Sequence, residues 1–256
     1  MPTNKPHIIG VIPARHDSVR FPGKVLALIA GKPMIQRVYE QASQARLLDE
    51  LFVAVDDTRI FDCVSGFGGK AVMTGRQHQS GTDRIAEAVA QLEAGIVVNI
   101  QGDHPLLDPQ MIDDTIQPLL DHPEIPMATL KTRMFRKEDF SNPNKVRVVT
   151  DENNLALYFS RAVIPFSRKK QEETEMFEHL GIYVYRKDFL LTFSQWPVGR
   201  LEKIEMLEQL RVLEKGHKIY VAETTSPNVQ PGSLSVDTPE DLQTVEQFIR
   251  ENQLET

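Results

Sequence analysis

The sequence predicts an α/β fold in which a mainly parallel sheet carries helices on both of its faces. Two sequence patterns alternate through the first half of the chain: short runs that are apolar throughout, and longer stretches with apolar residues at helical spacing. Strands without a polar side belong to parallel sheets that are covered on both faces. The length of 256 residues and the 41% hydrophobic content fit a single domain that builds its core without disulfides or metals.

The order of the predicted strands and helices follows from these sequence patterns. The first half has strand candidates at 7–12, 51–55, 71–73 and 96–100, and helix candidates at 34–48, 60–67 and 82–92. The second half is less regular, with strand candidates at 145–149, 155–159, 180–185 and 219–222, and helix candidates at 202–213 and 237–250. We therefore expect one domain over residues 1–256 that contains a smaller mixed region at roughly 145–215.

The overall charge and the cysteine content limit the class of protein. The formal net charge is −7, so a broad electrostatic attraction to nucleic acid is not expected. Cys63 is the single cysteine, which excludes an intrachain disulfide. No apolar stretch approaches the roughly 20 residues that span a bilayer, and residues 1–6 do not resemble a signal peptide. We expect a cytoplasmic protein that does not bind nucleic acid or membranes.

The first candidate strand ends in a loop that carries several cations. The loop of residues 13–24 holds Arg15, Arg20 and Lys24, and a Pro-Gly pair precedes the lysine. Backbone N–H groups and cations can converge in such a loop, and glycine lets a ligand approach closely, so the loop suits a polyphosphate. The alternative is a solvated basic loop without a ligand.

Two aspartates are candidates for binding a hard cation. Asp103 follows the apolar strand candidate 96–100, at the end where open α/β sheets bind their ligands. Asp237 follows a short apolar run in the last part of the chain. Carboxylates in such places suit Mg²⁺ beside phosphates. For Asp237 the alternative is a plain helix N-cap, because a helix is expected to begin there.

Several other residues have a structural explanation. Residues 80–84, Ser-Gly-Thr-Asp-Arg, are typical of the capping segment of a helix, although N–H groups left free there could also contact a nucleotide base. His78, His104 and His179 lack the spacing of a zinc site. Phe166 is expected to be a packing residue.

A series of motifs, in one order along nearly the whole chain, resembles the 3-deoxy-manno-octulosonate cytidylyltransferases, also called CMP-Kdo synthetases. The motifs are Pro-Ala-Arg at 13–15, Arg-Phe-Pro-Gly-Lys at 20–24, Gly-Lys-Pro-Met-Ile at 31–35, His-Gln-Ser-Gly-Thr at 78–82, Gln-Gly-Asp at 101–103, Ala-Leu-Tyr-Phe-Ser-Arg-Ala at 156–162, Ile-Pro at 164–165, His-Leu-Gly-Ile-Tyr at 179–183, Ile-Glu-Met-Leu-Glu-Gln-Leu-Arg at 204–211 and Val-Asp-Thr-Pro-Glu-Asp at 236–241.

The resemblance implies a nucleotidyltransferase-like, Rossmann-like fold, dependence on Mg²⁺ and a homodimer. It implies transfer of CMP from CTP to the anomeric hydroxyl of Kdo, an acidic eight-carbon sugar, giving CMP-Kdo and pyrophosphate for lipopolysaccharide biosynthesis. By the same likeness, Arg15 and Lys24 would hold the triphosphate, and Asp103 and Asp237 would hold Mg²⁺. The substrate-binding residues would be Ala14, Ser80, Gly81, Thr82, Gln101, Arg161, His179, Tyr183, Glu208 and Gln209, and the region at roughly 145–215 would serve sugar binding and dimerisation.

The expected reaction is an in-line displacement at the α-phosphorus of CTP. The anomeric hydroxyl attacks and pyrophosphate leaves, so the protein mainly supplies positioning and charge neutralisation. Arg161 or His179 would pair with the carboxylate of the sugar.

Three places depart from the usual pattern of the family. His104 replaces the glutamate of Gln-Gly-Asp-Glu-Pro, Gly75 replaces an arginine so that Arg76 comes one residue later, and residues 230–235 differ from the usual Pro-Gly-Thr-Gly. Two alternatives therefore stay open: the same reaction on the 8-amino analogue of Kdo, or another sugar nucleotidyltransferase. A non-enzymatic sugar-nucleotide sensor is the alternative from a different class, and it would be expected to lack one of the two carboxylates.

Overall fold

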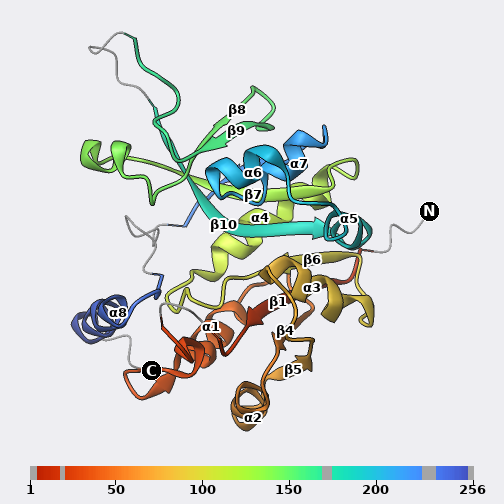
Figure 1. Ribbon diagram of the computed structural model, residues 1–256, viewed down its shortest axis with the longest axis vertical. Coiled ribbons are helices and arrows are strands. Elements are labelled where there is room, and N and C mark those ends of the chain that lie inside the picture. The colour runs from red at the N-terminus through yellow and green to blue at the C-terminus, as the bar shows by residue number, and fades with distance from the viewer. Residues whose placement is uncertain (1–4, 18–20, 169–174, 227–234, 253–256) are drawn as a thin grey trace.

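One mixed sheet runs through the molecule. The computed structural model describes residues 5–17, 21–168, 175–226 and 235–252 (Figure 1). Its strands are β1 (Ile8–Ala14), β2 (Leu28–Ile29), β3 (Lys32–Pro33), β4 (Glu50–Val55), β5 (Lys70–Met73), β6 (Ile96–Asn99), β7 (Met127–Arg133), β8 (Arg147–Thr150), β9 (Ala156–Ser160), β10 (Phe177–Arg186) and β11 (Tyr220–Glu223). Nine of these described strands form one sheet in the order β11-β7-β10-β6-β1-β4-β5, with β8 paired to β10 and β9 paired to β8, and β2 pairs with β3.

The sheet is parallel around its first strand and antiparallel around β10. β1 pairs in parallel with both β4 and β6, and β5 continues the parallel arrangement beyond β4. The long strand β10 is antiparallel to β6 and to β7, whereas β11 is parallel to β7. The parallel sheet predicted from the first half of the chain is therefore confirmed. The irregular second half supplies the antiparallel part and shares the same sheet through β10.

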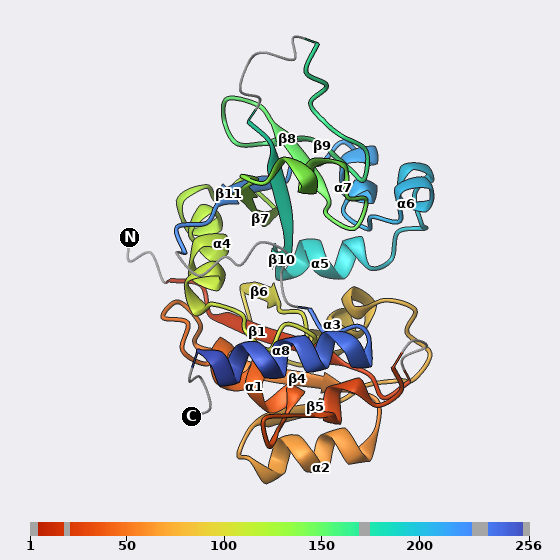
Figure 2. The same ribbon diagram turned by 90° about the vertical axis from the view of Figure 1, so that its left-hand side faces the viewer.

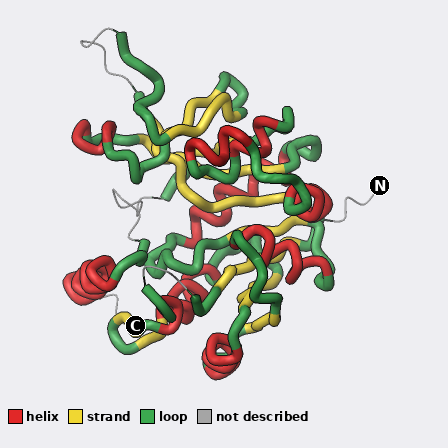
Figure 3. The backbone as a smooth tube through the Cα atoms, viewed as in Figure 1, coloured by secondary structure: helices red, strands yellow, loops and turns green. Residues whose placement is uncertain are grey.

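Helices cover both faces of the sheet, as the apolar strands predict. The helices in the described ranges are α1 (Met34–Ala42), α2 (Thr58–Gly66), α3 (Gly81–Ala90), α4 (Pro109–Asp121), α5 (Lys187–Phe193), α6 (Arg200–Glu205), α7 (Leu210–Glu214) and α8 (Pro239–Glu251). Residues of α1, α2, α4 and α8 enter the core on one face, and residues of α3, α5 and α7 enter the core on the other. Figure 3 shows the helices, in red, on either side of the strands, in yellow. None of these described helices is both long and apolar enough to cross a membrane.

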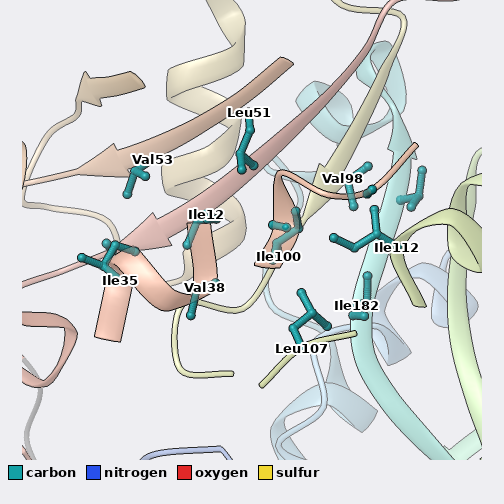
Figure 4. Close-up of a cluster of buried hydrophobic side chains, with 14 of the residues drawn as sticks. Ile12, Ile35, Val38, Leu51, Val53, Val98, Ile100, Leu107, Ile112 and Ile182 are labelled. Carbon is teal, nitrogen blue, oxygen red and sulfur yellow. The ribbon is translucent and has the colours of Figure 1, made fainter. Parts of the chain in front are cut away.

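The side chains of β1 alternate between these two cores. Ile8 and Ile12 lie in the core with α1 and α4, while Ile9 and Val11 lie in the core with α3 and α5. Each of the four is at most 1% exposed. Figure 4 shows Ile12 among the side chains of the first core. Burial of one such side chain contributes roughly 2 kcal/mol, so a strand that is buried on both faces is apolar at every position.

Some predicted elements differ from the structure in extent. The helix expected over 34–48 ends at Ala42, and the chain then leaves the helix through a turn. The helix α4 and the strand β7 were not expected, although Asp108 accepts a hydrogen bond from the N–H of Gln110 as the N-cap of α4. Pro118 lies inside α4 and obscures its helical pattern in the sequence.

The helix expected at 202–213 is two short helices, because its middle turns a corner. Met206 ends α6 with a left-handed backbone, at a φ of 55°. Glu202 and Arg211 are nine residues apart, and on one continuous helix that separation would be about 13.5 Å along the axis. Their side chains instead form a buried ion pair with an N···O distance of 2.6 Å. The ion pair between Glu202 and Arg211 can therefore form only because the chain turns at Met206.

The last helix brings Asp237 to the sheet edge without using it as a cap. Thr238 is the N-cap of α8, since its hydroxyl accepts from the N–H of Asp241 at 3.2 Å and the Asp241 carboxylate accepts from the N–H of Thr238 at 2.9 Å. In Figure 2, α8 lies across the lower half of the molecule near α1, and its Glu246 accepts from the N–H of Ala30 at 3.0 Å. The N-cap interpretation of Asp237 is therefore wrong.

Candidate functional site

Two adjoining cavities open where the parallel strands end. β1, β4 and β6 run in the same direction, so the loops that follow them meet at one edge of the sheet, where open α/β sheets bind ligands. The first cavity has a volume of about 310 Å³ and the second about 620 Å³. Both are lined by Gln79, Ser80, Gly81 and Gln101, which therefore form their common wall.

Lys24 joins the two candidate metal-binding aspartates in the first cavity. Its ammonium donates to Asp103 Oδ2 at 2.9 Å, to Asp237 Oδ1 at 3.0 Å and to the carbonyl oxygen of Val236 at 3.0 Å. A backbone hydrogen bond of 2.9 Å from the N–H of Val236 to the carbonyl of Asp103 holds the two segments side by side. The two carboxylates, which come from distant parts of the chain, thus converge on one cation.

The charges of the first cavity stabilise one another. Burial raises the pKa of Asp103, but the basic neighbours His104 and Lys24 lower it by more, so the pKa lies below its ordinary value. Burial lowers the pKa of Lys24, yet Asp103 and Asp237 raise it above its ordinary value. Asp103 is therefore a carboxylate and Lys24 an ammonium at neutral pH.

Arg84 fixes the base of the cationic loop, and the sequence motifs did not single it out. Its side chain is 3% exposed, and Nη2 donates to Asp56 Oδ2 at 2.8 Å while Nη1 donates to the hydroxyl of Thr74 at 2.6 Å. The other oxygen of Asp56 accepts from the N–H of His16 at 3.1 Å. One guanidinium on α3 thus ties the loops after β1, β4 and β5 together. A charged residue next to the apolar face of a predicted helix was the available signal.

The second cavity is lined by polar side chains of α3, β10 and the corner between α6 and α7. The hydroxyl of Tyr183 donates to Gln209 Oε1 at 3.2 Å, and the hydroxyl of Thr82 donates to the carboxylate of Glu208. Gln209 is 2% exposed, and its Nε2 has no hydrogen-bond partner within the described structure. A buried amide that lacks an acceptor costs free energy, so this group suits an oxygen atom of a ligand.

The common wall is the beginning of α3. Ser80 is the N-cap of this helix, because its hydroxyl accepts from the N–H of Asp83 at 3.1 Å. The capping function predicted for this segment is therefore confirmed. The start of a helix also carries a partial positive charge, and here that charge faces the junction of the two cavities.

Eleven of the predicted site residues line one or both cavities. The first cavity contains Arg15, Lys24, Asp103 and Asp237, the second contains Thr82, Tyr183, Glu208 and Gln209, and the common wall contains Ser80, Gly81 and Gln101.

Three predicted residues line neither cavity. Ala14 is 1% exposed and belongs to the core. Arg161 directs its guanidinium to two backbone carbonyls, at 2.9 Å and 3.0 Å. His179 is 8% exposed with Nε2 2.8 Å from the hydroxyl of Thr129, and burial lowers the pKa of His179 to about 3. An imidazole that is uncharged at neutral pH cannot form the ion pair with a sugar carboxylate that was expected of it.

The departures from the family pattern lie beside the first cavity. The N–H of Gly75 donates to both oxygens of Glu87, at 3.0 Å and 3.2 Å. Arg76 donates to a backbone carbonyl at the end of β4 at 3.1 Å, and Nε2 of His104 is 3.6 Å from the carboxylate of the preceding residue. Most of the third departure, at 230–235, lies outside the described residues.

Comparison with known proteins assigns the family. A family model for cytidylyltransferases matches residues 9–219. The 3-deoxy-manno-octulosonate cytidylyltransferase of Syntrophotalea carbinolica is 52% identical over 251 residues, which cover 95% of this chain and 98% of that relative. This chain belongs to the 3-deoxy-manno-octulosonate cytidylyltransferase family. The family expected from the order of the motifs is thereby confirmed.

Another member of the family and two solved structures agree with this assignment of family and fold. The 3-deoxy-manno-octulosonate cytidylyltransferase of Geobacter sulfurreducens is 49% identical and covers 93% of this chain and 98% of its own length. A structure of CMP:2-keto-3-deoxy-manno-octonic acid synthetase complexed with CTP has a TM-score of 0.89 at 42% identity, covering 96% of this chain and 99% of that one. A 4-diphosphocytidyl-2C-methyl-D-erythritol synthase from Anaerococcus prevotii shares the fold, with a TM-score of 0.62 at 12% identity. The nucleotidyltransferase-like fold is confirmed.

The burial of His179 predicts a stability that falls in acid. Its pKa is about 3 in the folded chain, against an ordinary value of 6.5, so below pH 6.5 the unfolded chain takes up a proton that the folded chain does not. The free energy of unfolding should then fall by about 1.4 kcal/mol per pH unit from this group alone. Urea denaturation at pH 6.5 and pH 5 should show a loss about 1.6 kcal/mol smaller in His179→Gln than in the natural chain, because the unfolded imidazole is already half protonated at pH 6.5. Equal losses in both chains would contradict this account.

Proposed function

We propose that this protein transfers the cytidylyl group of CTP to the anomeric hydroxyl of Kdo, giving CMP-Kdo and pyrophosphate for lipopolysaccharide biosynthesis. The observation that carries the proposal is the pair of adjoining cavities, one rich in charged groups and one with an unpaired amide donor. Relatives with about half of their residues identical bear the name of this activity, and the solved relative was complexed with CTP. We place the reaction in the cytoplasm, where nucleoside triphosphates are made.

The first cavity suits the nucleotide. Arg15, Lys24 and Arg84 bring three cations to its wall, which complements the charge of a triphosphate. The common wall with Ser80 and Gln101 offers hydroxyl and amide groups next to the start of α3. An α-phosphate at this wall would face the second cavity, as transfer to a second substrate requires.

The second cavity suits an acidic sugar with several hydroxyl groups. Tyr183, Glu208 and Gln209 offer donors and acceptors that can be paired with sugar hydroxyls. Lys203 also lines this cavity, and we assign to it the pairing with the sugar carboxylate in place of His179.

Asp103 and Asp237 fit a Mg²⁺ ion. Their carboxylates already converge on the ammonium of Lys24, within 3.0 Å, and they supply the hard oxygen ligands that Mg²⁺ prefers. In the described chain, no three or more His, Cys, Asp or Glu side chains are grouped as a metal cage. This agrees with an ion that takes one or two carboxylates and completes its shell with phosphates and water. When bound, Mg²⁺ would neutralise charge on the phosphates of CTP.

The side chains of the protein mainly position the two substrates. Lys24 would donate to phosphate oxygens once a metal ion shares its carboxylate partners, and Arg15 would neutralise the departing pyrophosphate. Glu208 and Gln209 would orient the sugar so that its anomeric oxygen attacks in line with the leaving group.

The function is tested by identifying the product. Incubation with CTP, Mg²⁺ and Kdo should yield CMP-Kdo by mass, together with one pyrophosphate per product. Parallel incubations replace Kdo by its 8-amino analogue or by sialic acid, and CTP by UTP. A product only with sialic acid or with UTP would assign another sugar nucleotidyltransferase, and binding without any product would indicate a sensor. A higher kcat/KM for the 8-amino analogue than for Kdo would assign the 8-amino sugar as the acceptor.

The carboxylate pair is tested by removing one charge. Asp103→Asn should lower kcat by roughly a hundredfold or more while leaving the thermal midpoint nearly unchanged, because the carboxylate acts on charge in the transition state. Lys24→Met should instead act mainly through the KM for CTP. Asp121→Asn, at the exposed end of α4, is the matched control and should keep normal kinetics. Near-normal turnover of Asp103→Asn at saturating Mg²⁺ would rule out the metal assignment.

We also propose a homodimer, supported by an exposed apolar patch. The patch consists of Leu157, Val163, Phe166, Ile204 and Met206, which are between 40% and 83% exposed in the single chain. Hydrogen bonds from Ser160 and Arg161 to the carboxylate of Glu205 bring the end of β9 and the end of α6 together. Phe166, expected to be a packing residue, is 83% exposed. Large apolar patches of this kind mark protein–protein contacts.

The patch predicts the mass in solution. Light scattering should give about twice the 29.1 kDa of one chain, and the double variant Phe166→Glu, Ile204→Glu should give the mass of one chain. A natural chain that scatters as a single copy at micromolar concentration would contradict the dimer.

A further inference from the structure

Arg211 is a nearly buried residue in the lining of the second cavity. It is 6% exposed, and Nε and Nη2 donate to the two carboxylate oxygens of Glu202 at 2.7 Å and 2.6 Å. Nη2 also lies 3.5 Å from Glu208 Oε1, and the guanidinium faces the ring of Phe193 at 4.8 Å. Two parallel bonds and a stacked plane are a geometry that arginine provides and lysine does not.

The guanidinium closes the corner that presents the polar groups to the cavity. Glu202 belongs to α6, Arg211 belongs to α7, and Glu208 and Gln209 lie between the two helices. The same Glu202 carboxylate accepts from the N–H of Gly199 at 2.8 Å, so both ends of the segment are anchored through it. Without this link, the corner would lose the contact that sets the positions of Glu208 and Gln209.

The same guanidinium sets the charge of Glu208. Burial raises the pKa of this carboxyl, whereas the hydroxyl of Thr82 and the charge of Arg211 lower it. Removing Arg211 would leave the carboxyls of Glu202 and Glu208 buried without a cation, and Glu208 would then take up a proton more readily. The titratable groups that face Glu208 or line its cavity are Arg211, Glu202 and Lys203 of the α6–α7 segment, Asp83 of α3, and Tyr183 and Tyr185 of β10.

We propose that Arg211 is a positioning residue for the acceptor sugar, holding Glu208 toward the second cavity as a hydrogen-bond acceptor for sugar hydroxyls. This inference rests on the proposed function, because it takes the second cavity as the sugar site. Arg211 does not line the first cavity. Its effect therefore falls on the sugar and leaves CTP binding intact.

The test separates an effect on sugar binding from an effect on nucleotide binding, and the charge of Arg211 from the shape of its guanidinium. In Arg211→Met the KM for Kdo should rise about tenfold at saturating CTP, with the KM for CTP unchanged. The acidic limb of kcat/KM for Kdo should move to higher pH, because Glu208 loses its cation. Arg211→Lys should return the limb toward its natural position but keep part of the KM increase. Glu202→Gln should move the limb the opposite way, to lower pH, since Arg211 then serves Glu208 alone.

Arg186→Met is the matched control. Arg186 donates to three backbone carbonyls at 2.8–3.1 Å, and it lines neither cavity. It should lower stability without changing the KM for Kdo or the position of the acidic limb.

Two outcomes would overturn the proposal. One is a folded Arg211→Met with the natural KM for Kdo and the natural acidic limb. The other, which decides the matter if Arg211→Met does not fold, is an acidic limb in Glu202→Gln that stays in place or moves to higher pH. Failure of the proposed function is a different result, since the natural chain would then form no CMP-Kdo at all.

Discussion

The candidate site depends on one ammonium group that joins three distant parts of the chain. Lys24 comes from the loop after β1, Asp103 from the loop after β6, and Asp237 from the approach to α8. The lysine side chain is 14% exposed, so its ammonium depends on these carboxylates to offset the water that burial removes from it. The capping box of Thr238 and Asp241 starts α8 without Asp237, which leaves that carboxylate for the cavity.

Two buried arginines, one on either side of the common wall, also join separate parts of the chain through ion pairs. Arg84 on α3 holds the loops around the first cavity through Asp56, and Arg211 on α7 holds the corner at the second cavity through Glu202. In both cases the partner lies on another element, so the ion pair fixes the position of one backbone segment relative to another. Helix packing alone would leave these loops with several possible positions, because apolar contacts have little direction.

The mixed sheet explains why the two cavities adjoin. The parallel strands bring the loops of the first cavity to one edge, and β10 runs antiparallel beside β6 so that Tyr183 pairs with Asn99 at that same edge. The second cavity, which we propose as the sugar site, therefore receives Tyr183 from an antiparallel strand next to the end of a parallel one. Ser80 and the start of α3 lie between them, where a phosphorus atom bound in one cavity can face a hydroxyl bound in the other.

The sequence by itself determined what depends on local pattern. Apolar runs predicted the parallel strands, and the residues that follow those strands predicted the cationic loop and Asp103, since a strand end and its loop are neighbours in the chain. The motif order then identified the family. Only the tertiary structure decided the corner at Met206, the uncharged state of His179 and the roles of Arg84 and Arg211. Each of these depends on contacts or burial contributed by other elements, which the pattern of a single segment does not contain.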